Sequence, residues 1–256
     1  MKKISIMLVI CMLALMLFSA CDSGNSPAPV EETEPAITEE VKETEPPVFD
    51  TNYEIETIGE KDENENGEVI GDCHFQKVVF INPDEALAKI NDEINEECNE
   101  FFSEGNGMGY EEYFSQLTDE AKVGLAEYPY LATYDVDSVF IDDNYVSIIY
   151  KWEWFAGGVY NYGSTGLNFD LKTGEELDFE DLFANEADAR SAFENAVNAI
   201  IDEQSEAFFE DAKETVKNYD LDDVKFSLNG KFITIYIDQY EIAPGASGAF
   251  TAIISK

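Results

Sequence analysis

The sequence predicts an α+β fold in which antiparallel sheets carry helices packed on one face, preceded by a disordered tether. Three observations support this prediction. Segments with a hydrophobic period of two and segments with a helical period follow one another in mixed order. Short turn sequences join several strand segments, and strands joined by tight turns are antiparallel. Hydrophobic residues make up 45% of the chain, which is enough to bury a core.

The first 20 residues have the pattern of a bacterial export signal. Lys2 and Lys3 precede an apolar run over 4–18, which is too short to span a bilayer comfortably, and small residues lead up to Cys21. This order resembles a bacterial lipoprotein signal, in which the cysteine is diacylated and becomes the mature N-terminus. We therefore expect cleavage after residue 20 and a lipid-anchored protein that faces outward from the cell membrane. An ordinary secretory signal or an uncleaved anchor would also export the domain.

Residues 21–52 have the composition of a disordered tether. Five of the eight prolines lie here, among repeated Glu and Thr residues and almost no large apolar side chains. Such a stretch cannot bury enough surface to offset the loss of chain entropy, and its prolines and like charges favour extended conformations. The segment is therefore predicted to be a stalk between the anchor and a folded ectodomain.

Residues 53–130 are predicted to form a small α+β domain. An amphipathic helix is expected to begin at Pro83, and a second helical pattern follows a glycine-rich break. Residues 62–68 match the opening of a calcium-binding loop, but Cys73 stands where the bidentate glutamate should be. We therefore interpret them as a hairpin tip. The predicted elements are strands over 53–58 and 73–81 and helices over 83–103 and 113–128.

Residues 131–256 are predicted to form a larger α+β domain. The hydrophobic period changes to two at Leu131, and the sequences at 142–144 (Asp-Asp-Asn) and 229–230 (Asn-Gly) predict hairpin turns. The predicted strands cover 134–141, 145–155, 166–171, 224–228, 232–237 and 250–254, with a short helical turn over 178–183 and a helix over 186–218.

Cys73 and Cys98 are the two cysteines that remain once the signal and Cys21 are set aside. An even number of cysteines in an exported protein favours a disulfide. If helix 83–103 folds back along strand 73–81, its rise of about 1.5 Å per residue would bring the two thiols together. The sequence therefore predicts a disulfide between them, with two buried free thiols as the alternative.

The formal net charge of −40 restricts the classes of partner. It repels nucleic acid and anionic lipid headgroups, so we expect no nucleic-acid partner. It attracts cations, cationic peptides and basic proteins, and this attraction weakens as the salt concentration rises. Solubility on a crowded surface would explain the same charge.

The sequence contains no recognisable catalytic motif, and we predict no enzyme activity, no metal site and no cofactor. His74 is the only histidine, and patterns such as HExxH, GxSxG, CxxC and the P-loop are absent. A zinc site built from His74, Cys73, Cys98 and a carboxylate is the alternative. With 55 acidic residues no carboxylate pair stands out, so a carboxylate-dependent hydrolase remains an alternative without a defined site.

Aromatic residues around the glycine-rich segment 156–163 are the main candidates for ligand binding. Tyr150, Trp152 and Trp154 occupy alternate positions of one predicted strand, and a loop with several glycines follows them. Aromatic faces beside a loop can stack on sugars or anchor a protein partner, although most such residues pack in a core. The candidate ligand-binding residues are Trp152, Trp154, Tyr160 and Tyr162.

From Tyr134 to the end, the order of motifs resembles the RsiV-type extracellular domain. The matching stretches are 145–150, 156–158, 167–177 with 179–183, and 239–248. This domain occurs in lysozyme-sensing anti-sigma factors and as the non-catalytic module of peptidoglycan deacetylases. The resemblance implies an exported α+β domain that binds something at the cell envelope, with lysozyme as one ligand class. Neither sigma-factor signalling nor deacetylation is expected to transfer.

The sequence thus favours a cell-surface lipoprotein whose ectodomain binds an envelope or host component, such as a cationic protein or a cell-wall component. Lipid on Cys21 would attach it to the membrane. A carboxylate-dependent hydrolase of cell-wall glycan and a structural accessory protein of an envelope complex are the alternatives.

Overall fold

The computed structural model describes residues 52–255, and all of them belong to one compact unit. Within this range the chain forms five α-helices and eight β-strands, which are arranged in two sheets. The predicted α+β class is therefore confirmed. The predicted signal peptide, Cys21 and nearly all of the predicted tether lie outside the described residues.

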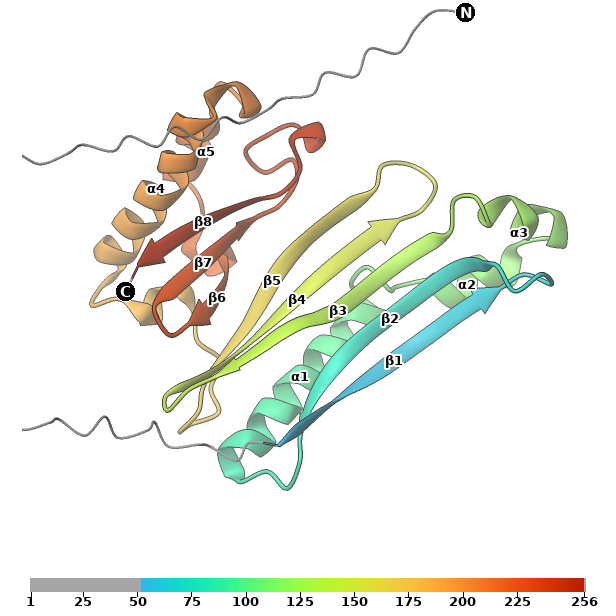
Figure 1. The fold of residues 1–256 in the computed structure, drawn as a ribbon, viewed down its shortest axis with the longest axis horizontal. Coiled ribbons are helices and arrows are strands. Elements are labelled where there is room, and N and C mark those ends of the chain that lie inside the picture. Colours follow the sequence, from blue (N-terminus) through green and yellow to red (C-terminus); the bar gives the residue numbers. More distant parts are fainter. Residues whose placement is uncertain (1–51, 256) are drawn as a thin grey trace, which may run out of the picture. The chain divides into compact units, whose positions relative to one another are not determined.

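Five strands form the first sheet: β1 (Tyr53–Glu63), β2 (Val69–Phe80), β3 (Tyr130–Ile141), β4 (Tyr145–Phe155) and β5 (Asn161–Asp170). They lie side by side in their order along the chain (Figure 1). Three of the four neighbouring pairs are antiparallel, as predicted. The exception is β2 and β3, which run parallel from the pair Gly71 and Tyr130 to the pair Phe75 and Tyr134.

The parallel pair joins the two segments that the sequence predicted as separate domains. The predicted boundary between residues 130 and 131 falls at the start of β3, so strands from both segments share one sheet. The connection between β2 and β3 contains α1 (Glu85–Ser103), α2 (Tyr110–Gln116) and α3 (Asp119–Leu125). A parallel pair needs such a long crossover, because the chain must return to the same end of the sheet.

Helix α2 and helix α3 replace the single helix predicted over 113–128. Leu117 adopts an extended backbone conformation between them, with φ −74° and ψ 135°. Thr118 then caps α3, because its hydroxyl accepts a hydrogen bond from the Ala121 N–H at 3.2 Å. The apolar spacing in the sequence continued through this break and concealed it.

Helix α1 packs on the first sheet through residues at helical spacing: Ile90, Ile94, Cys98 and Phe101. Two asparagines fix its register against β2. Asn91 accepts a hydrogen bond from Phe80 N–H at 2.9 Å and donates one to Phe80 O at 3.0 Å. One turn later, Lys77 donates to the Asn95 side chain at 2.8 Å. The helix therefore runs back along β2.

The predicted disulfide is absent, since Cys73 and Cys98 are both buried free thiols. The reason lies in the register that starts from Asn91 and Phe80. From Phe80 to Cys73 the strand advances about 23 Å, which corresponds to about 15 helical residues beyond Asn91. Cys98 comes only seven residues after Asn91, so it lies along α1 well before the level of Cys73. The Cys73 thiol instead contacts the carbonyl oxygen of Gly107 at 3.9 Å.

The second sheet is antiparallel and contains β6 (Lys225–Asn229), β7 (Phe232–Ile237) and β8 (Phe250–Ser255) in that order. Its hydrophobic core includes residues of α4 (Glu186–Glu203) and α5 (Ala212–Lys217). The helix predicted over 186–218 is therefore interrupted between residues 203 and 212. The hairpins predicted at 142–144 and 229–230 are both confirmed.

A buried polar network joins the two sheets. Ser147 and Asn168 are paired across β4 and β5 and are 0% and 1% exposed. The Ser147 hydroxyl donates to Asn168 Oδ1 at 2.7 Å and accepts from the Leu228 N–H at 2.9 Å, while Asn168 Nδ2 donates to Phe226 O at 2.8 Å. These bonds hold β6 against the first sheet.

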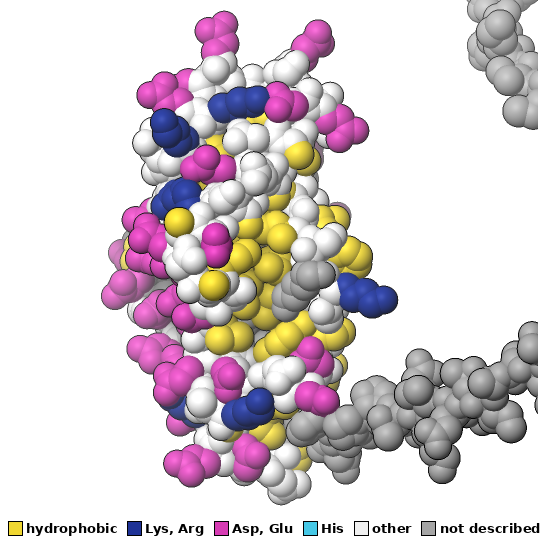
Figure 2. Space-filling model, turned by 90° about the vertical axis from the view of Figure 1, so that its left-hand side faces the viewer, with side chains coloured by type: hydrophobic (Ala, Val, Ile, Leu, Met, Phe, Trp, Pro, Cys, Tyr) yellow, Lys and Arg dark blue, Asp and Glu magenta, His cyan; other side chains and the backbone are white. Residues whose placement is uncertain are grey.

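The surface carries many more acidic than basic side chains. Figure 2 shows one face on which apolar side chains gather in the middle and acidic side chains surround them. In the part of the chain that the structure describes, no helix combines the length and the apolar character needed to cross a membrane.

Candidate functional site

A groove of about 420 Å³ lies between the β4–β5 hairpin and strands β7 and β8. Three of the four predicted ligand-binding residues line it, namely Trp152, Tyr160 and Tyr162. The opposite wall comes from the second sheet and includes Tyr236 and Phe250. The groove therefore brings together aromatic side chains that are far apart in the sequence, and we refer to it below as the aromatic groove.

Trp154, the fourth predicted residue, does not line the aromatic groove. It packs against the core on the α1 side of the first sheet, where its strand neighbour Tyr150 is 1% exposed. For these two residues the structure agrees with the alternative interpretation, in which aromatic side chains on a strand are part of the core.

The loop between β7 and β8 is tied to the start of β5 through Gln239. Its side-chain oxygen accepts a hydrogen bond from the Tyr162 N–H at 2.9 Å, and its amide nitrogen donates to Gly245 O at 3.1 Å. Tyr240 has a positive φ of 71°, which is unusual for a residue other than glycine. A side chain at Gly245 would overlap the Tyr240 ring, so the glycine is needed for this packing.

A row of aromatic rings leads toward the aromatic groove; Tyr128, Tyr160 and Tyr162 in it are exposed and Phe155 is half-buried. Ring centroids are separated by 6.5 Å between Tyr128 and Phe155, by 6.3 Å between Phe155 and Tyr160, and by 5.7 Å between Tyr160 and Tyr162. Tyr160 and Tyr162 are 41% and 42% exposed. Exposed rings that lie next to one another are typical of surfaces that bind partners.

The polar side chains of the aromatic groove include two carboxylates and one lysine: Glu153, Asp238 and Lys151. Lys151 forms an ion pair with Asp137, so its charge is already compensated. Burial and a hydrogen bond to Glu153 raise the pKa of Tyr160 to about 12, so this phenol stays protonated and neutral at physiological pH.

Asp238 is a largely buried charged group of the groove. Its side chain is 12% exposed, and its Oδ2 atom pairs with Lys225. Its Oδ1 atom receives no hydrogen bond from any described residue. A side chain on Gly163 would overlap both this oxygen and the Trp152 indole, so glycine is required where the two sheets meet.

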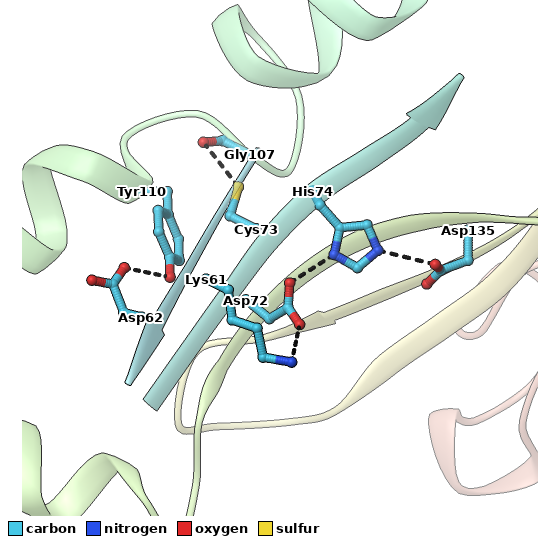
Figure 3. Close-up of polar contacts among 8 residues, drawn as sticks. All are labelled: Lys61, Asp62, Asp72, Cys73, His74, Gly107, Tyr110 and Asp135. Atoms are coloured by element: carbon cyan, nitrogen blue, oxygen red, sulfur yellow. Dashed lines mark hydrogen bonds and ion pairs between the residues drawn. The ribbon is translucent and has the colours of Figure 1, made fainter. Parts of the chain in front are cut away.

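The single histidine lies on β2 between two carboxylates (Figure 3). His74 Nδ1 is 2.7 Å from an Asp72 oxygen, and His74 Nε2 is 3.0 Å from an Asp135 oxygen. Burial lowers the pKa of His74, but hydrogen bonds to Asp135 and Asp72 outweigh it and raise the pKa above its ordinary value. We call this group the histidine clamp, because it links β2 to β3.

The histidine clamp is not part of a zinc site. Successive residues of a strand point to opposite faces, so Cys73 and His74 cannot converge on one ion. The Cys73 thiol contacts the Gly107 carbonyl, and both imidazole nitrogens of His74 are hydrogen-bonded to aspartates (Figure 3). Within residues 52–255, no group of three or more histidine, cysteine or acidic side chains is arranged to hold a metal ion.

The calcium-like segment forms a hairpin tip between β1 and β2, as interpreted. Asn64 Oδ1 accepts hydrogen bonds from the N–H groups of Asn66 and Glu68 at 2.9 and 3.0 Å. Asp62 accepts a hydrogen bond from the Tyr110 hydroxyl at 2.8 Å. These oxygens therefore stabilise the turn and its contact with α2.

Sequence reasoning missed two features of these sites. One is the wall that the second sheet adds to the aromatic groove, including Asp238. The other is the histidine clamp, although Asp72 and His74 at alternate positions of one strand were a signal that both side chains share a face. Asp135 is 61 residues further along the chain than His74, and only the parallel pairing brings it close.

The C-terminal part of the chain is similar to a described protein family. Residues 180–256 match the family model DUF3298, a protein family of unknown function. This segment contains α4, α5 and the whole second sheet, and therefore one wall of the aromatic groove. A search of curated proteins found no match.

Two crystal structures of DUF3298 family proteins share the fold of this chain. The protein from Bacteroides fragilis NCTC 9343 is 16% identical, with 80% of this chain and 91% of that chain covered and a TM-score of 0.52. The protein from Pseudomonas aeruginosa PAO1 is 15% identical, with 80% and 92% covered and a TM-score of 0.51. At these identities the comparison shows the fold alone.

Proposed function

We propose that this chain is a lipid-anchored recognition protein at the outside of a bacterial cell, and that its aromatic groove binds a basic protein of the envelope or of a host. The observation that supports this proposal most directly is the combination of half-exposed aromatic rings with the carboxylates Glu153 and Asp238 in one groove. The signal-like pattern before Cys21 and the acidic, proline-rich segment after it support the location.

A lysine or arginine side chain has the chemistry that such a groove recognises. Its aliphatic part packs on aromatic rings, and its charge interacts with a ring face by about 0.5–1 kcal/mol at an exposed site. Glu153 adds charge attraction, while ion pairs already compensate Asp238 (with Lys225) and Lys151 (with Asp137). The net charge of −40 would attract a basic protein from a distance.

The binding proposal is tested by titrating the exported chain without its lipid, residues 22–256, with lysozyme as the basic protein. We expect an affinity that falls steeply as salt rises, because the attraction is electrostatic. Tyr162→Ala should weaken binding about tenfold, since it removes an aromatic contact in the groove. Tyr113→Ala is the matched control, because Tyr113 is 39% exposed on α2 and lies outside the groove.

Equal effects of the two tyrosine variants, or binding that salt does not weaken, would contradict recognition in the aromatic groove. Turnover of purified peptidoglycan by the same preparation would support the hydrolase alternative instead. The location is tested by labelling growing cells with a fatty-acid analogue, where Cys21→Ser should abolish the label and release the protein from the membrane.

A further inference from the structure

The outer edge of β1 is free among the strands that the structure describes, because β1 is the first strand of its sheet (Figure 1). Ten of its eleven residues are exposed, and Asp62 is the exception. Three large apolar side chains on this strand are exposed: Ile55 by 47%, Tyr53 by 40% and Ile58 by 39%. Free strand edges can pair with another chain through their backbone.

The hydrogen-bonding pattern shows which backbone groups point to that edge. The Ile81 N–H donates to Asn52 O at 2.8 Å, so the facing pair Asn52 and Ile81 is a hydrogen-bonded one. The register then continues without interruption from Tyr53 opposite Phe80 to Asp62 opposite Gly71. Hydrogen-bonded and non-bonded pairs alternate in an antiparallel ladder. The outward N–H and C=O groups are therefore those of Tyr53, Ile55, Thr57, Gly59 and Lys61.

A cavity of about 580 Å³ lies beside this edge, on the side of the sheet that α1 and α2 cover. Ile58 and Phe102 give it apolar walls, and Glu60, Glu111 and Glu112 contribute carboxylates. None of these three glutamates forms an ion pair with a described lysine, arginine or histidine. The cavity can therefore accept an aliphatic stem that ends in a positive charge.

The charge of β1 selects among the chains that could pair with it. The strand contains five acidic residues and one lysine. A second copy would place two such strands side by side, and their like charges would repel each other. A basic strand would instead meet opposite charge on β1 and on the glutamates of the cavity.

We propose that β1 accepts an extended basic segment of a partner protein as an additional strand of the first sheet. The backbone of that segment pairs with the outward groups around Thr57. Every second side chain points to the cavity side of the sheet, where a lysine or arginine stem packs on Ile58 and its charge reaches Glu60, Glu111 or Glu112. This site is separate from the aromatic groove and stands without it.

The probe is a blocked heptapeptide in which lysine and valine alternate, titrated into the exported chain. Thr57→Pro removes one outward N–H and leaves the ladder with β2 intact, which is the position where an edge strand tolerates proline. We expect it to weaken peptide binding about tenfold or more, while Thr57→Val, which keeps the N–H, leaves binding unchanged. Equal binding by the two variants would overturn the proposal.

A second measurement uses the unmodified protein, so it does not depend on the folding of a variant. Two versions of the peptide carry N-methyl groups on the odd or on the even backbone nitrogens. One version should lose binding and the other should retain it, because only alternate N–H groups of an added strand face β1. Equal affinities of the two versions would refute strand addition.

The cavity is tested by replacing two of its glutamates, Glu111→Gln with Glu112→Gln. The matched control is Glu203→Gln with Glu206→Gln, which changes the net charge equally but lies outside the cavity. Only the substitutions in the cavity should weaken peptide binding. If both pairs weaken it equally, the net charge alone attracts the peptide, and the proposal is overturned.

Two further outcomes identify other occupants or other sites. Dimerisation of the chain without peptide, abolished by Thr57→Pro, would make a second copy the occupant and overturn the basic partner. Peptide bound in the aromatic groove would respond to Tyr162→Ala and not to Thr57→Pro, and it too would overturn strand addition. Failure of either site is therefore distinguishable from failure of the other.

Discussion

Two polar arrangements join the strands of this protein, and they differ in burial and charge. The network of Ser147 and Asn168 is neutral and almost fully buried, and it connects the two sheets. The histidine clamp is ionic and only partly buried, and it connects β2 to β3 within one sheet. The first should therefore contribute more to stability and should not depend on pH, while the second should contribute less and should follow the protonation of His74.

The largest loss of stability is expected from a substitution where β5 of the first sheet packs against β6 of the second. In Gly166→Ala the new Cβ would overlap the carbonyl oxygen of Phe226, so β5 and β6 would have to separate. We expect the free energy of unfolding to fall by about 3 kcal/mol, measured by urea denaturation. Gly158→Ala is the control and should change it by less than about 0.5 kcal/mol, because no atom lies within 4 Å of its Cβ position.

Asn168→Ala should have the next largest effect. It leaves the Phe226 carbonyl and the Ser147 hydroxyl without their partner in a buried site, which lowers the free energy of unfolding by about 2–3 kcal/mol. The loss should be the same at pH 6 and pH 9, since no group in the network titrates there. A loss below that of the exposed control Asn195→Ala would mean that the network does not hold the sheets together.

The histidine clamp should show a smaller and pH-dependent effect. The folded pKa of His74 is raised above the unfolded value of about 6.5. Its stabilisation is therefore fully present below the unfolded pKa and is lost as pH rises through the folded pKa. We expect His74→Gln to reduce stability by about 1 kcal/mol at low pH and by less at high pH.

The protonation of His74 can be followed directly by NMR, because the chain has no other histidine. The titration midpoint should lie above that of the unfolded chain and should drop in Asp135→Asn, which removes one of the two hydrogen bonds. A midpoint at or below the unfolded value would show that the two aspartates do not hold the imidazolium.

The cysteines should show no effect of reductant at all. Both thiols are free, and burial, followed by the charges of Asp72 and Glu60, raises the pKa of Cys73 to about 12. The melting temperature should be the same with and without reductant, and the folded protein should resist alkylation. After unfolding without reductant, residues 22–256 should be alkylated at both Cys73 and Cys98. Alkylation at neither would show that the two cysteines form a disulfide.

The hairpins were predictable because their signals are local. Turn residues at 142–144 and 229–230 stand between segments of period two, and both hairpins form there. The helix predicted over 186–218 failed in its middle for a physical reason. Phe208 lies in the interruption yet packs into the same core as Ile201 and Ala212, so the apolar spacing continued where the helix did not.

The candidate site was predictable only in part. Trp152, Tyr160 and Tyr162 stood out by their spacing around a glycine-rich loop, and they do share a groove. Asp238 directly follows β7 of the second sheet and carried no signal among so many acidic residues. Trp154 has the same type and spacing as Trp152 but packs against the core on the α1 side, because the packing on each part of a strand depends on what covers it.

By itself the sequence determined the α+β class, both short hairpins and the acidic character of the surface, since each depends on neighbouring residues or on composition. Tertiary structure alone decided the parallel pairing of β2 with β3, the free thiols and the meeting of the two sheets at Ser147 and Asn168. Those features depend on which surfaces pack and in which register, and contacts between residues far apart in the chain leave no local periodic pattern.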